Sequence, residues 1–520
     1  MYKSLITIAT ILGLTSTSAL AYDHFFQTGR SLGYGSAGTS SAHWSAAGSY
    51  NPALIGTAAG TSNDFFLVFN IRGQAVDQDN TVKTLDDFVQ ETEQFDEFSN
   101  EDLLEGDINL LQNNINTVNA IADAVDKLNG IGANIDLGGN AGIGMAFDRF
   151  AVSFQLNSQF SFGGTAIVDP ADTNLIRRFS HLGQFLLDDV RPLFDDKNRL
   201  EGDLTLAAAE LEEFKQLVET DPDSVSQADL DAAQATATNA QVAYDEALLL
   251  VDQAKSTEEK LYQEYGDIFD FDTNSVQFDS DDLKSNARFA AIGWFEASMT
   301  IGSNWKYKSG RTLSVGTTLK SVHLEFYDYQ ASATAFDEDK IDGDDYRNSK
   351  DFFTADLGMI LSLDRANRWR VGISVKNIMG TEIESNPVRL DEEQASLFFK
   401  VEPQFRLGTS YNATWFRVSA DIDVTESKGP QFADGSEFFQ GSQFASVGAV
   451  INAWDVVELR VGYRHNLIRA SDVLGSNSSS NNADTLTLGA GLYLGPVQLD
   501  LGLQAAKDRV GAGFQTMITW

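Results

Sequence analysis

The sequence has 520 residues, no cysteine and a formal net charge of −38, with 42 glycines, 35 phenylalanines and only 8 prolines. Such acidity argues against a nucleic-acid partner, because few cations are present to neutralise phosphates. An exported chain without cysteine cannot use disulfides, so its stability must come from burial and backbone pairing. After the N-terminal segment there is no run of about 18 apolar residues, so no transmembrane helix is expected.

The first residues have the pattern of a secretory signal peptide. Lys3 precedes an apolar stretch that ends near Leu14, and Ala19-Leu20-Ala21 is a small-x-small cleavage site. The apolar stretch is too short to span about 30 Å of hydrocarbon as a membrane anchor. We therefore expect residues 1–21 to be a cleaved signal peptide and the mature chain to begin near Tyr22.

Alternation of apolar and polar residues dominates the chain after the first sixty residues. In the stretch DTLTLGAGLYL, apolar residues occupy every second position from Leu486 to Leu494. Each such segment has about the 9–11 residues that a tilted strand needs to cross a bilayer. We expect about fourteen strands, near 64–75, 133–147, 150–164, 288–305, 312–328, 352–363, 369–378, 398–411, 415–425, 443–452, 456–467, 485–494, 497–506 and 509–520.

The connections between these strands divide into short and long. Short turns follow the even-numbered strands, whereas six of the seven connections after odd-numbered strands are long. Outer-membrane barrels have short periplasmic turns and long extracellular loops. The sequence thus predicts an all-β fold: a transmembrane antiparallel β-barrel over residues 63–520, in the outer membrane of a Gram-negative bacterium, among lipid and lipopolysaccharide. The alternative is a soluble barrel.

Tryptophans provide a separate indication of a membrane boundary. Five of the seven lie beside a predicted short turn or at the C-terminus, where a periplasmic aromatic girdle is expected. These five are Trp305, Trp369, Trp415, Trp454 and Trp520. The alternate residues of the last strand are expected to face lipid, with Trp520 closing the strand at the inner rim.

Two of the long insertions have helical patterns. Residues 76–132 form an acidic loop with a helix from Ile108 to Gly130, and residues 165–287 contain a helical hairpin at 200–265 that is interrupted at Pro222. Many alanines occupy the seam of the second arm, which indicates close helix packing. The hairpin either packs on itself and the barrel rim or serves as a docking arm for a protein partner.

A Gly-, Ala- and Ser-rich segment without strand periodicity precedes the first strand. Within it, RSLGYGSAG and SAAGSYNPALIG at residues 30–56 resemble the start of FadL-like outer-membrane transport proteins, and the acidic loop and its helix resemble the conjugal-transfer TraF-like branch of that superfamily. The resemblance implies that residues 22–62 fold into the lumen as a hatch and that the hatch motif is Asn51, Pro52 and Ala53. It also implies a lateral opening near strand three.

The predicted alternation between lipid-facing and lumen-facing positions directs charged side chains of both signs into the lumen. These charges either brace barrel and hatch as an ion-paired network or form a polar constriction that selects solutes. The lumen charges that we single out are Arg370, Arg406, Arg417, Asp421, Arg460 and Asp500. Possible wall kinks are Gly163 and Gly164 in strand three and Pro403 in strand eight, since proline cannot donate a ladder bond.

The sequence favours a transporter over an enzyme. No nucleophile lies at catalytic spacing from the five histidines, so we expect no catalytic residues, no cofactor and no metal site. The leading function is passive uptake of a hydrophobic or amphipathic small molecule that binds at the outer mouth, with the hatch shifting to open a path. The alternative is a structural or adhesion component of a cell-surface, conjugal transfer-type apparatus. A general porin is the third possibility, which a plugging hatch argues against.

Overall fold

The computed structural model describes residues 27–61, 64–77, 108–128, 133–221, 225–267, 269–270, 275–276, 284–332, 344–386, 396–433, 435, 437–438, 441–453, 456–468, 484–507 and 509–520. The chain divides into two compact units, which we describe separately. A helical unit includes Asp87–Asp126 and Asp169–Lys284, and a barrel unit includes Thr10–Asp86, Lys127–Val168 and Ser285–Trp520. The expected signal peptide and residue Trp454 lie outside the described residues.

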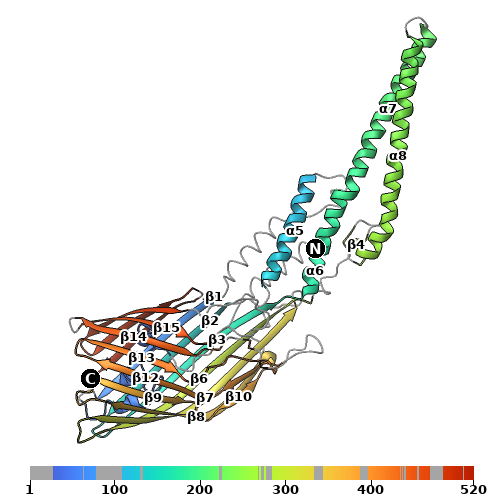
Figure 1. The fold of residues 1–520 in the computed structure, drawn as a ribbon. Coiled ribbons are helices and arrows are strands. Elements are labelled where there is room, and N and C mark those ends of the chain that lie inside the picture. The colour runs from blue at the N-terminus through green and yellow to red at the C-terminus, as the bar shows by residue number, and fades with distance from the viewer. Residues whose placement is uncertain are drawn as a thin grey trace. The chain divides into compact units, whose positions relative to one another are not determined.

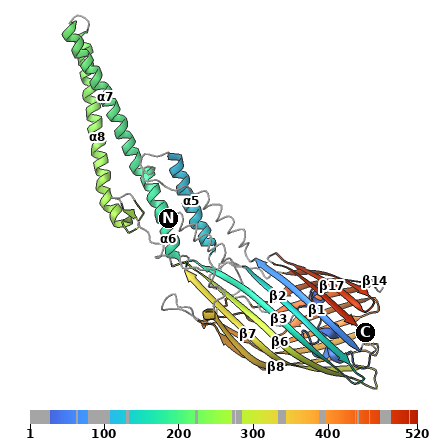
Figure 2. The same cartoon turned by 180° about the vertical axis from the view of Figure 1, so that it is seen from behind.

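Fourteen antiparallel strands close into a barrel, which confirms the predicted fold (Figures 1 and 2). The first strand pairs with the last, with Phe66 opposite Thr519. In order around the barrel from β1 through β2, the strands are β1 (Phe65–Asp77), β2 (Ala133–Ala146), β3 (Phe150–Ile167), β6 (Asn286–Lys306), β7 (Thr312–Ser332), β8 (Arg347–Ser362), β9 (Trp369–Lys376), β12 (Gln404–Asn412), β13 (Phe416–Asp423), β14 (Phe444–Ala453), β15 (Val457–Asn466), β16 (Thr485–Leu494), β17 (Val497–Ala505) and β18 (Arg509–Thr519).

The two faces of the barrel wall differ in polarity along most of its length. On β16, Leu486 and Leu488 face outward and are exposed, whereas Thr485 and Thr487 face inward and are buried. On β17, Leu501 and its outward neighbours alternate with buried Gln498, Asp500 and Gln504 in the same way. The wall is therefore apolar outside and polar inside, as a strand that separates lipid from a polar lumen requires.

Aromatic side chains gather at one end of the barrel, which we call the short-turn end. Trp305, Trp369, Trp415 and Trp520 lie at strand termini on this end, and at least half of each side chain is exposed. Trp520 stacks on Phe65 with ring centroids 4.1 Å apart. The opposite end, where the long connections lie, is called the long-loop end.

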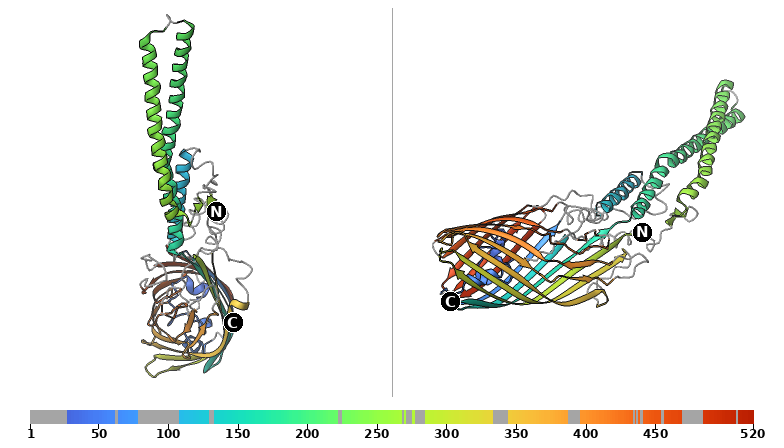
Figure 3. Two further views of the ribbon diagram at one scale, coloured as in Figure 1. Left: turned by 90° about the vertical axis from the view of Figure 1, so that its right-hand side faces the viewer. Right: turned by 60° about the horizontal axis from the view of Figure 1, so that its bottom comes forward.

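The segment before β1 lies inside the barrel and is called the hatch, residues 27–61 (Figure 3, left, in blue). It contains α2 (Gly29–Leu32), the 3-10 turn η1 (Trp44–Ala46) and α3 (Ala53–Gly56). Thr28 caps α2, because its hydroxyl accepts a hydrogen bond from the amide of Ser31. Most hatch residues are buried, so the hatch supplies much of the core inside the barrel.

A small hairpin replaces part of the predicted eighth strand. Residues 398–411 were expected as one strand, but β11 (Phe398–Val401) leaves the wall and pairs with β10 (Thr381–Glu384) in a separate two-stranded sheet. Pro403 lies between β11 and β12, where a residue without an amide hydrogen cannot continue the ladder. The alternation of the sequence is the same in both pieces, so periodicity alone could not reveal the break.

The helical unit contains the predicted helix and hairpin. Helix α5 (Ile108–Leu128) precedes β2, and α6 (Pro170–Phe185), the π-helical turn η3 (Leu186–Val190), α7 (Arg191–Thr220) and α8 (Gln227–Tyr265) follow β3. The seam of the hairpin is buried as predicted, with Leu211 of α7 and Ala247 of α8 among its residues. A short pair, β4 (Phe269–Asp270) and β5 (Ser275–Val276), follows α8, and a 3-10 turn, η6 (Asp344–Tyr346), precedes β8 of the barrel unit. Among the described helices, none has both the length and the apolarity needed to cross a membrane.

Candidate functional site: the hatch-filled lumen

The Asn-Pro-Ala motif holds two parts of the hatch together. The side-chain amide of Asn51 donates to the carbonyl oxygen of Thr39 at 2.8 Å, and its Oδ1 accepts from the amide of Ala53 at 3.0 Å. Pro52 stands at the N-cap of α3. Asn51 is fully buried, so both bonds are shielded from water. The motif therefore fixes the turn into α3 against an earlier loop of the hatch.

Wall side chains bind the hatch backbone at points around the barrel. Asn304 of β6 donates to the carbonyl oxygens of Gly56 and Ala59, and Lys376 of β9 donates to that of Ser49 at 2.8 Å. Further contacts come from β3, β13 and β16. They are Gln155 Nε2 to Ser45 O at 2.7 Å, Thr39 N to Asp421 Oδ2 at 2.8 Å, and Gly35 N to Thr487 Oγ1 at 2.8 Å. The wall thus satisfies peptide groups that an irregular buried segment cannot satisfy by itself.

A ring of inward-facing glycines forms the seat of the hatch, and we call it the glycine belt. At each of them, an added Cβ would lie 3.0 Å or less from a hatch atom. Several are neighbours across adjacent strands, such as Gly489, Gly502 and Gly513. The belt consists of Gly302, Gly316, Gly358, Gly372, Gly408, Gly448, Gly462, Gly489, Gly502 and Gly513.

Backbone contact explains why the belt positions hold glycine. A Cβ on Gly462 would meet the amide nitrogen of Gly35, and a Cβ on Gly489 would lie 2.8 Å from the Cα of Gly33. No real Cβ approaches backbone atoms so closely, so any larger residue would displace the hatch. The sequence carries this pattern as an apolar residue followed by glycine on ten strands, but only the strand register shows that these glycines share one level.

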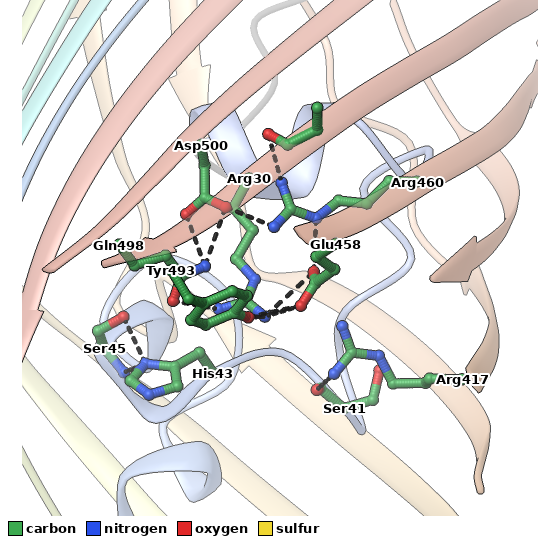
Figure 4. Close-up of polar contacts among 11 residues, drawn as sticks. Arg30, Ser41, His43, Ser45, Arg417, Glu458, Arg460, Tyr493, Gln498 and Asp500 are labelled. Atoms are coloured by element: carbon green, nitrogen blue, oxygen red, sulfur yellow. Dashed lines mark hydrogen bonds and ion pairs between the residues drawn. The ribbon is translucent and has the colours of Figure 1, made fainter. Parts of the chain in front are cut away.

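An ion-paired network joins α2 of the hatch to β15, β16 and β17 (Figure 4). Arg30 Nη2 lies 2.8 Å from Glu458 Oε2, and Arg460 Nε lies 2.6 Å from Glu458 Oε1. Arg460 also contacts Asp500, and Gln498 donates to Asp500 at 2.9 Å. The Tyr493 hydroxyl donates to Glu458 at 2.6 Å, and Arg30 reaches Tyr493 and Gln498. Two cations and two anions are balanced, which a buried network of this kind requires.

The hatch groups near this network have altered proton affinities. Burial opposes the charge of Arg30, but the adjacent Glu458 carboxylate raises the pKa of Arg30 above its ordinary value. Burial, followed by the positive charges of Arg30 and Arg417, lowers the pKa of His43 to about 3. Nδ1 of His43 lies 2.8 Å from the Ser45 hydroxyl. His43 is therefore neutral in the seated hatch at ordinary pH.

A second buried network lies on the other side of the lumen, and its members are not among the six predicted lumen charges. Lys320 of β7 lies 2.8 Å from Asp356 of β8 and 3.6 Å from Glu296 of β6. Asn157 donates to Glu296 at 2.8 Å. The alternation on the predicted strands directs Asp356 inward, but only the register shows that it meets Lys320 and Glu296.

The structure places the six predicted lumen charges on the inner face of the wall, in different settings. Arg460 and Asp500 belong to the Arg30 network, and Arg406 pairs with Asp423. Arg417 donates to the carbonyl oxygen of Ser41 and lies over the ring of Tyr34. The two remaining residues are Asp421, which binds Thr39, and Arg370, which is half-buried and donates to the carbonyl oxygen of Asn367. Arg417 and Asp421 contact the hatch directly and Arg460 pairs with Asp500, whereas Arg406 and Arg370 have partners elsewhere on the wall. The contacts of the first four favour bracing over a solute-selecting constriction.

The predicted wall kinks occupy different environments. Gly163 and Gly164 pair without interruption with Ala290 and Phe289 of β6, so the ladder is continuous at this point. A kink there stays a prediction. Pro403 lies at the departure of β11 from the wall rather than inside a wall strand.

The inner wall becomes apolar towards the long-loop end, in a region that we call the apolar tier. Its side chains come from β6 and β7 and are buried in one cluster with the β10–β11 hairpin. The tier consists of Ala290, Ile292, Trp294, Val322, Leu324 and Phe326. Trp294 is not one of the five tryptophans of the predicted girdle, and the structure places it on this inner surface.

Comparisons with known proteins give one family match and several similar solved structures. The model of the family described as "F plasmid transfer operon, TraF, protein" matches residues 48–423. No curated protein matches the chain. Similar solved structures include the toluene transporters TbuX of Ralstonia pickettii (9% identity, 96% of this chain and 98% of that chain, TM-score 0.43) and TodX of Pseudomonas putida (10%, 96% and 98%, 0.43), and a FadL homologue of Pseudomonas aeruginosa (8%, 96% and 99%, 0.44). At these TM-scores the backbones overlap too loosely to carry an inference.

Proposed function

This chain belongs to the family described as F plasmid transfer operon, TraF, protein, and we propose that it is an outer-membrane transport protein for passive uptake of hydrophobic or amphipathic small molecules. The family match confirms the resemblance to the conjugal-transfer TraF-like branch. The observation that carries the proposal is a closed barrel whose lumen is filled by a hatch below an inward-facing apolar tier. No catalytic role and no cofactor are part of this proposal.

The outer surface of the barrel supports an outer-membrane location. Side chains such as Phe154, Leu319 and Leu488 face outward and are exposed, which would be unfavourable in water and is favourable against lipid. The four described tryptophans at the short-turn end fit the boundary between membrane and water. Among partners, this surface fits lipid and lipopolysaccharide.

The filled lumen argues against the general porin. A porin needs an open aqueous channel, whereas hatch residues Tyr34, Tyr50 and Leu54 are fully buried within the barrel. Passage through this lumen requires part of the hatch to move. A gated transporter for selected molecules is therefore the better proposal.

The hatch rests on β1, β2 and β3, three adjacent strands, differently from the ten strands of the glycine belt. The one other strand without a belt glycine, β13, stands alone between belt strands and binds the hatch through Asp421 and Ser419. On the side of β1, β2 and β3 the hatch contacts side chains: the ring centroids of Trp44 and Phe66 are 4.5 Å apart, and the side chain of Gln155 of β3 lies against Gly48. Nine of the ten belt glycines instead lie against hatch backbone, and Gly408 lies against the side chain of Thr39. A side chain can rotate out of a contact, whereas a backbone contact breaks only when the segment itself moves. We place the opening beside β1, β2 and β3.

Uptake by cells tests the proposed function. Cells that lack other hydrophobic-compound channels would be given radiolabelled toluene or radiolabelled oleate, with and without this protein. Faster accumulation of either compound supports the proposal, and the comparison distinguishes compact from long-chain substrates. A variant that lacks residues 27–61 should raise leak conductance in planar bilayers. Equal accumulation with and without the protein would contradict the proposal.

A component of a cell-surface apparatus is the second candidate, and one observation favours it. Leu206 of α7 and Val242 and Leu249 of α8 are each more than half exposed on the hairpin, outside its buried seam. Exposed apolar side chains on a long helical hairpin fit a docking arm for a protein partner. Deleting the hairpin separates the two candidates, as described in the Discussion.

A further inference from the structure

The wall strand β7 reverses its polarity at the level of the apolar tier. Nearer the short-turn end, Leu319 faces outward and Lys320 faces inward. Above that level, His323 and Glu325 face outward, and buried Leu324 and Phe326 face inward. An apolar inner face and a polar outer face are what a wall needs when it has water outside and an apolar body inside.

The apolar body against the tier is the chain's own hairpin. Ile383 of β10 and Phe399 and Val401 of β11 lie in one cluster with the tier and are almost fully buried. On the opposite face of the hairpin, Glu382 and Lys400 form an exposed ion pair at 3.2 Å. The hairpin is thus a two-faced cover whose apolar side rests on the tier.

The cover is attached to the barrel by contacts at its edges. Lys350 and Asn348 of β8 donate to the carbonyl oxygens of Glu382 and Glu384 at 2.7 and 2.8 Å. The hairpin shares no ladder with any wall strand, because β10 and β11 form a separate sheet. Moving the hairpin away would therefore leave every ladder bond of the barrel intact.

Paired charges lie at both ends of the tier. Towards the long-loop end, Arg288 and Asp328 form a buried ion pair at 2.6 Å. On the other side, Lys320 is paired with Asp356 and Glu296. The tier offers a ligand apolar contact of limited length rather than a counter-ion.

We propose that the apolar tier is a binding site for a compact, uncharged apolar molecule and that the β10–β11 hairpin occupies this site until it swings aside. This inference rests on the proposed function, because it names the class of substrate and the element that guards it. The aromatic ring of Phe399 and the branched chain of Ile383 show which shapes the tier accepts. A ligand replaces these side chains on the wall.

Single-cysteine labelling tests the proposal, since the natural chain has no cysteine. Ala290→Cys places a thiol in the tier, and Ala58→Cys places a control thiol in the hatch; both alanines are buried. Each would be labelled with a maleimide in the full-length protein in nanodiscs, alone and combined with Ile383→Asp, with and without saturating toluene. Phe399→Asp serves as a second release variant, and heat-modifiable migration shows that each barrel is folded.

We expect Ile383→Asp to speed labelling of Ala290→Cys about 10- to 100-fold, because it removes the apolar anchor of the cover. Toluene should then slow this labelling again, and Ala58→Cys should respond to neither change. Unchanged labelling in both release variants would show that the hairpin is no cover. Faster labelling without protection by toluene would show that the tier is no binding site.

Parallel uptake measurements separate this inference from the proposed function. Protection by toluene without cellular accumulation would uphold the site and contradict the transport function. Accumulation of toluene or oleate without protection at Ala290→Cys would uphold transport and overturn the site.

Discussion

Arg30 of the hatch and Glu458 of β15 lie 428 residues apart in sequence and form a buried ion pair at 2.8 Å. The contact joins the irregular segment to the wall that surrounds it. Because Glu458 also binds Arg460 and Tyr493, the pair is the link between the hatch and a wider wall network. The stability of the seated hatch should therefore depend on Arg30.

Replacing Arg30 with alanine should loosen the hatch. The change leaves the buried Glu458 carboxylate with one cation instead of two, and breaking a buried ion pair costs about 3 kcal/mol or more. Leak conductance in planar bilayers should rise, and the temperature of heat-modifiable migration should fall. Arg30→Lys keeps the charge and should have a smaller effect. Equal conductance in Arg30→Ala and the natural protein would show that the pair does not hold the hatch.

Alanine at the glycine belt should unseat the hatch, whereas alanine elsewhere on the wall should not. In Gly462→Ala the new methyl group meets the backbone of Tyr34 and Gly35, and overpacking of this kind costs about 1–3 kcal/mol. Gly73 faces outward on β1, and its added Cβ would be in ordinary contact at 3.4 Å from Leu137. Gly73→Ala is thus the matched control. Similar conductance of the two variants would contradict the role of the belt.

Locking the hatch to β13 should leave uptake intact if the opening lies beside β1, β2 and β3. The hydroxyls of Ser41 and Ser419 are 2.7 Å apart, so the double variant Ser41→Cys/Ser419→Cys is placed to form a disulfide. Accumulation of radiolabelled toluene would be compared before and after reduction. A second pair, Ser40→Cys/Ser410→Cys, starts from hydroxyls 2.9 Å apart. Recovery of uptake only after reduction would mean that the hatch leaves as a whole.

Acid should weaken the seating of the hatch through His43. An unfolded histidine has a pKa near 6.5, and the pKa of seated His43 is about 3. Between these values the released hatch binds a proton that the seated hatch excludes. The free energy that holds the hatch in its seated position is thus most favourable above about pH 6.5 and becomes less favourable as the pH falls towards 3.

The measurement is leak conductance at pH 7.5 and pH 5.0 in the natural protein and in His43→Asn. Asparagine is a good N-cap residue and does not titrate, so it preserves the cap of η1 while removing the proton. Conductance should rise at pH 5.0 in the natural protein and change less in His43→Asn. Identical pH responses would assign the effect to other groups.

Deleting residues 200–265 should leave the barrel folded. The hairpin belongs to the helical unit, and its seam residues pack between α7 and α8. The shortened protein should retain heat-modifiable migration and toluene uptake. If the hairpin docks a protein partner, the deletion should abolish cell contact while sparing uptake. Loss of barrel folding would show that the hairpin is part of the core.

The barrel could be predicted from the sequence because its determinants are local. Alternation between lipid-facing and lumen-facing residues repeats every two positions and is interrupted by short turns. Most predicted strands therefore agree with the structure within a few residues. The seam of the α7–α8 hairpin was predictable for the same reason, since its spacing is local. The hatch, in contrast, was implied only by the family resemblance that the Asn-Pro-Ala motif carries, and not by a local pattern.

The seat of the hatch and the apolar tier could not be predicted, because they depend on contacts between distant strands. Gly302, Gly316 and Gly358 become a belt only when β6, β7 and β8 are aligned. The departure of β11 was also hidden, since Phe399 and Val401 continue the alternation of the wall strand that follows. The local pattern does not indicate that these residues pack against β6 and β7, because the same alternation is found in a strand of the barrel wall.

The hatch ends only a few residues before β1, and β1 is the strand that closes the ring by pairing with β18. A finished ring leaves no gap in its wall through which a folded segment of this size could be threaded. The belt glycines lie against hatch atoms, so little free space surrounds the seated hatch. We therefore expect the hatch to lie among the other strands before the first and last strands meet, so that the chain closes the barrel around its own beginning.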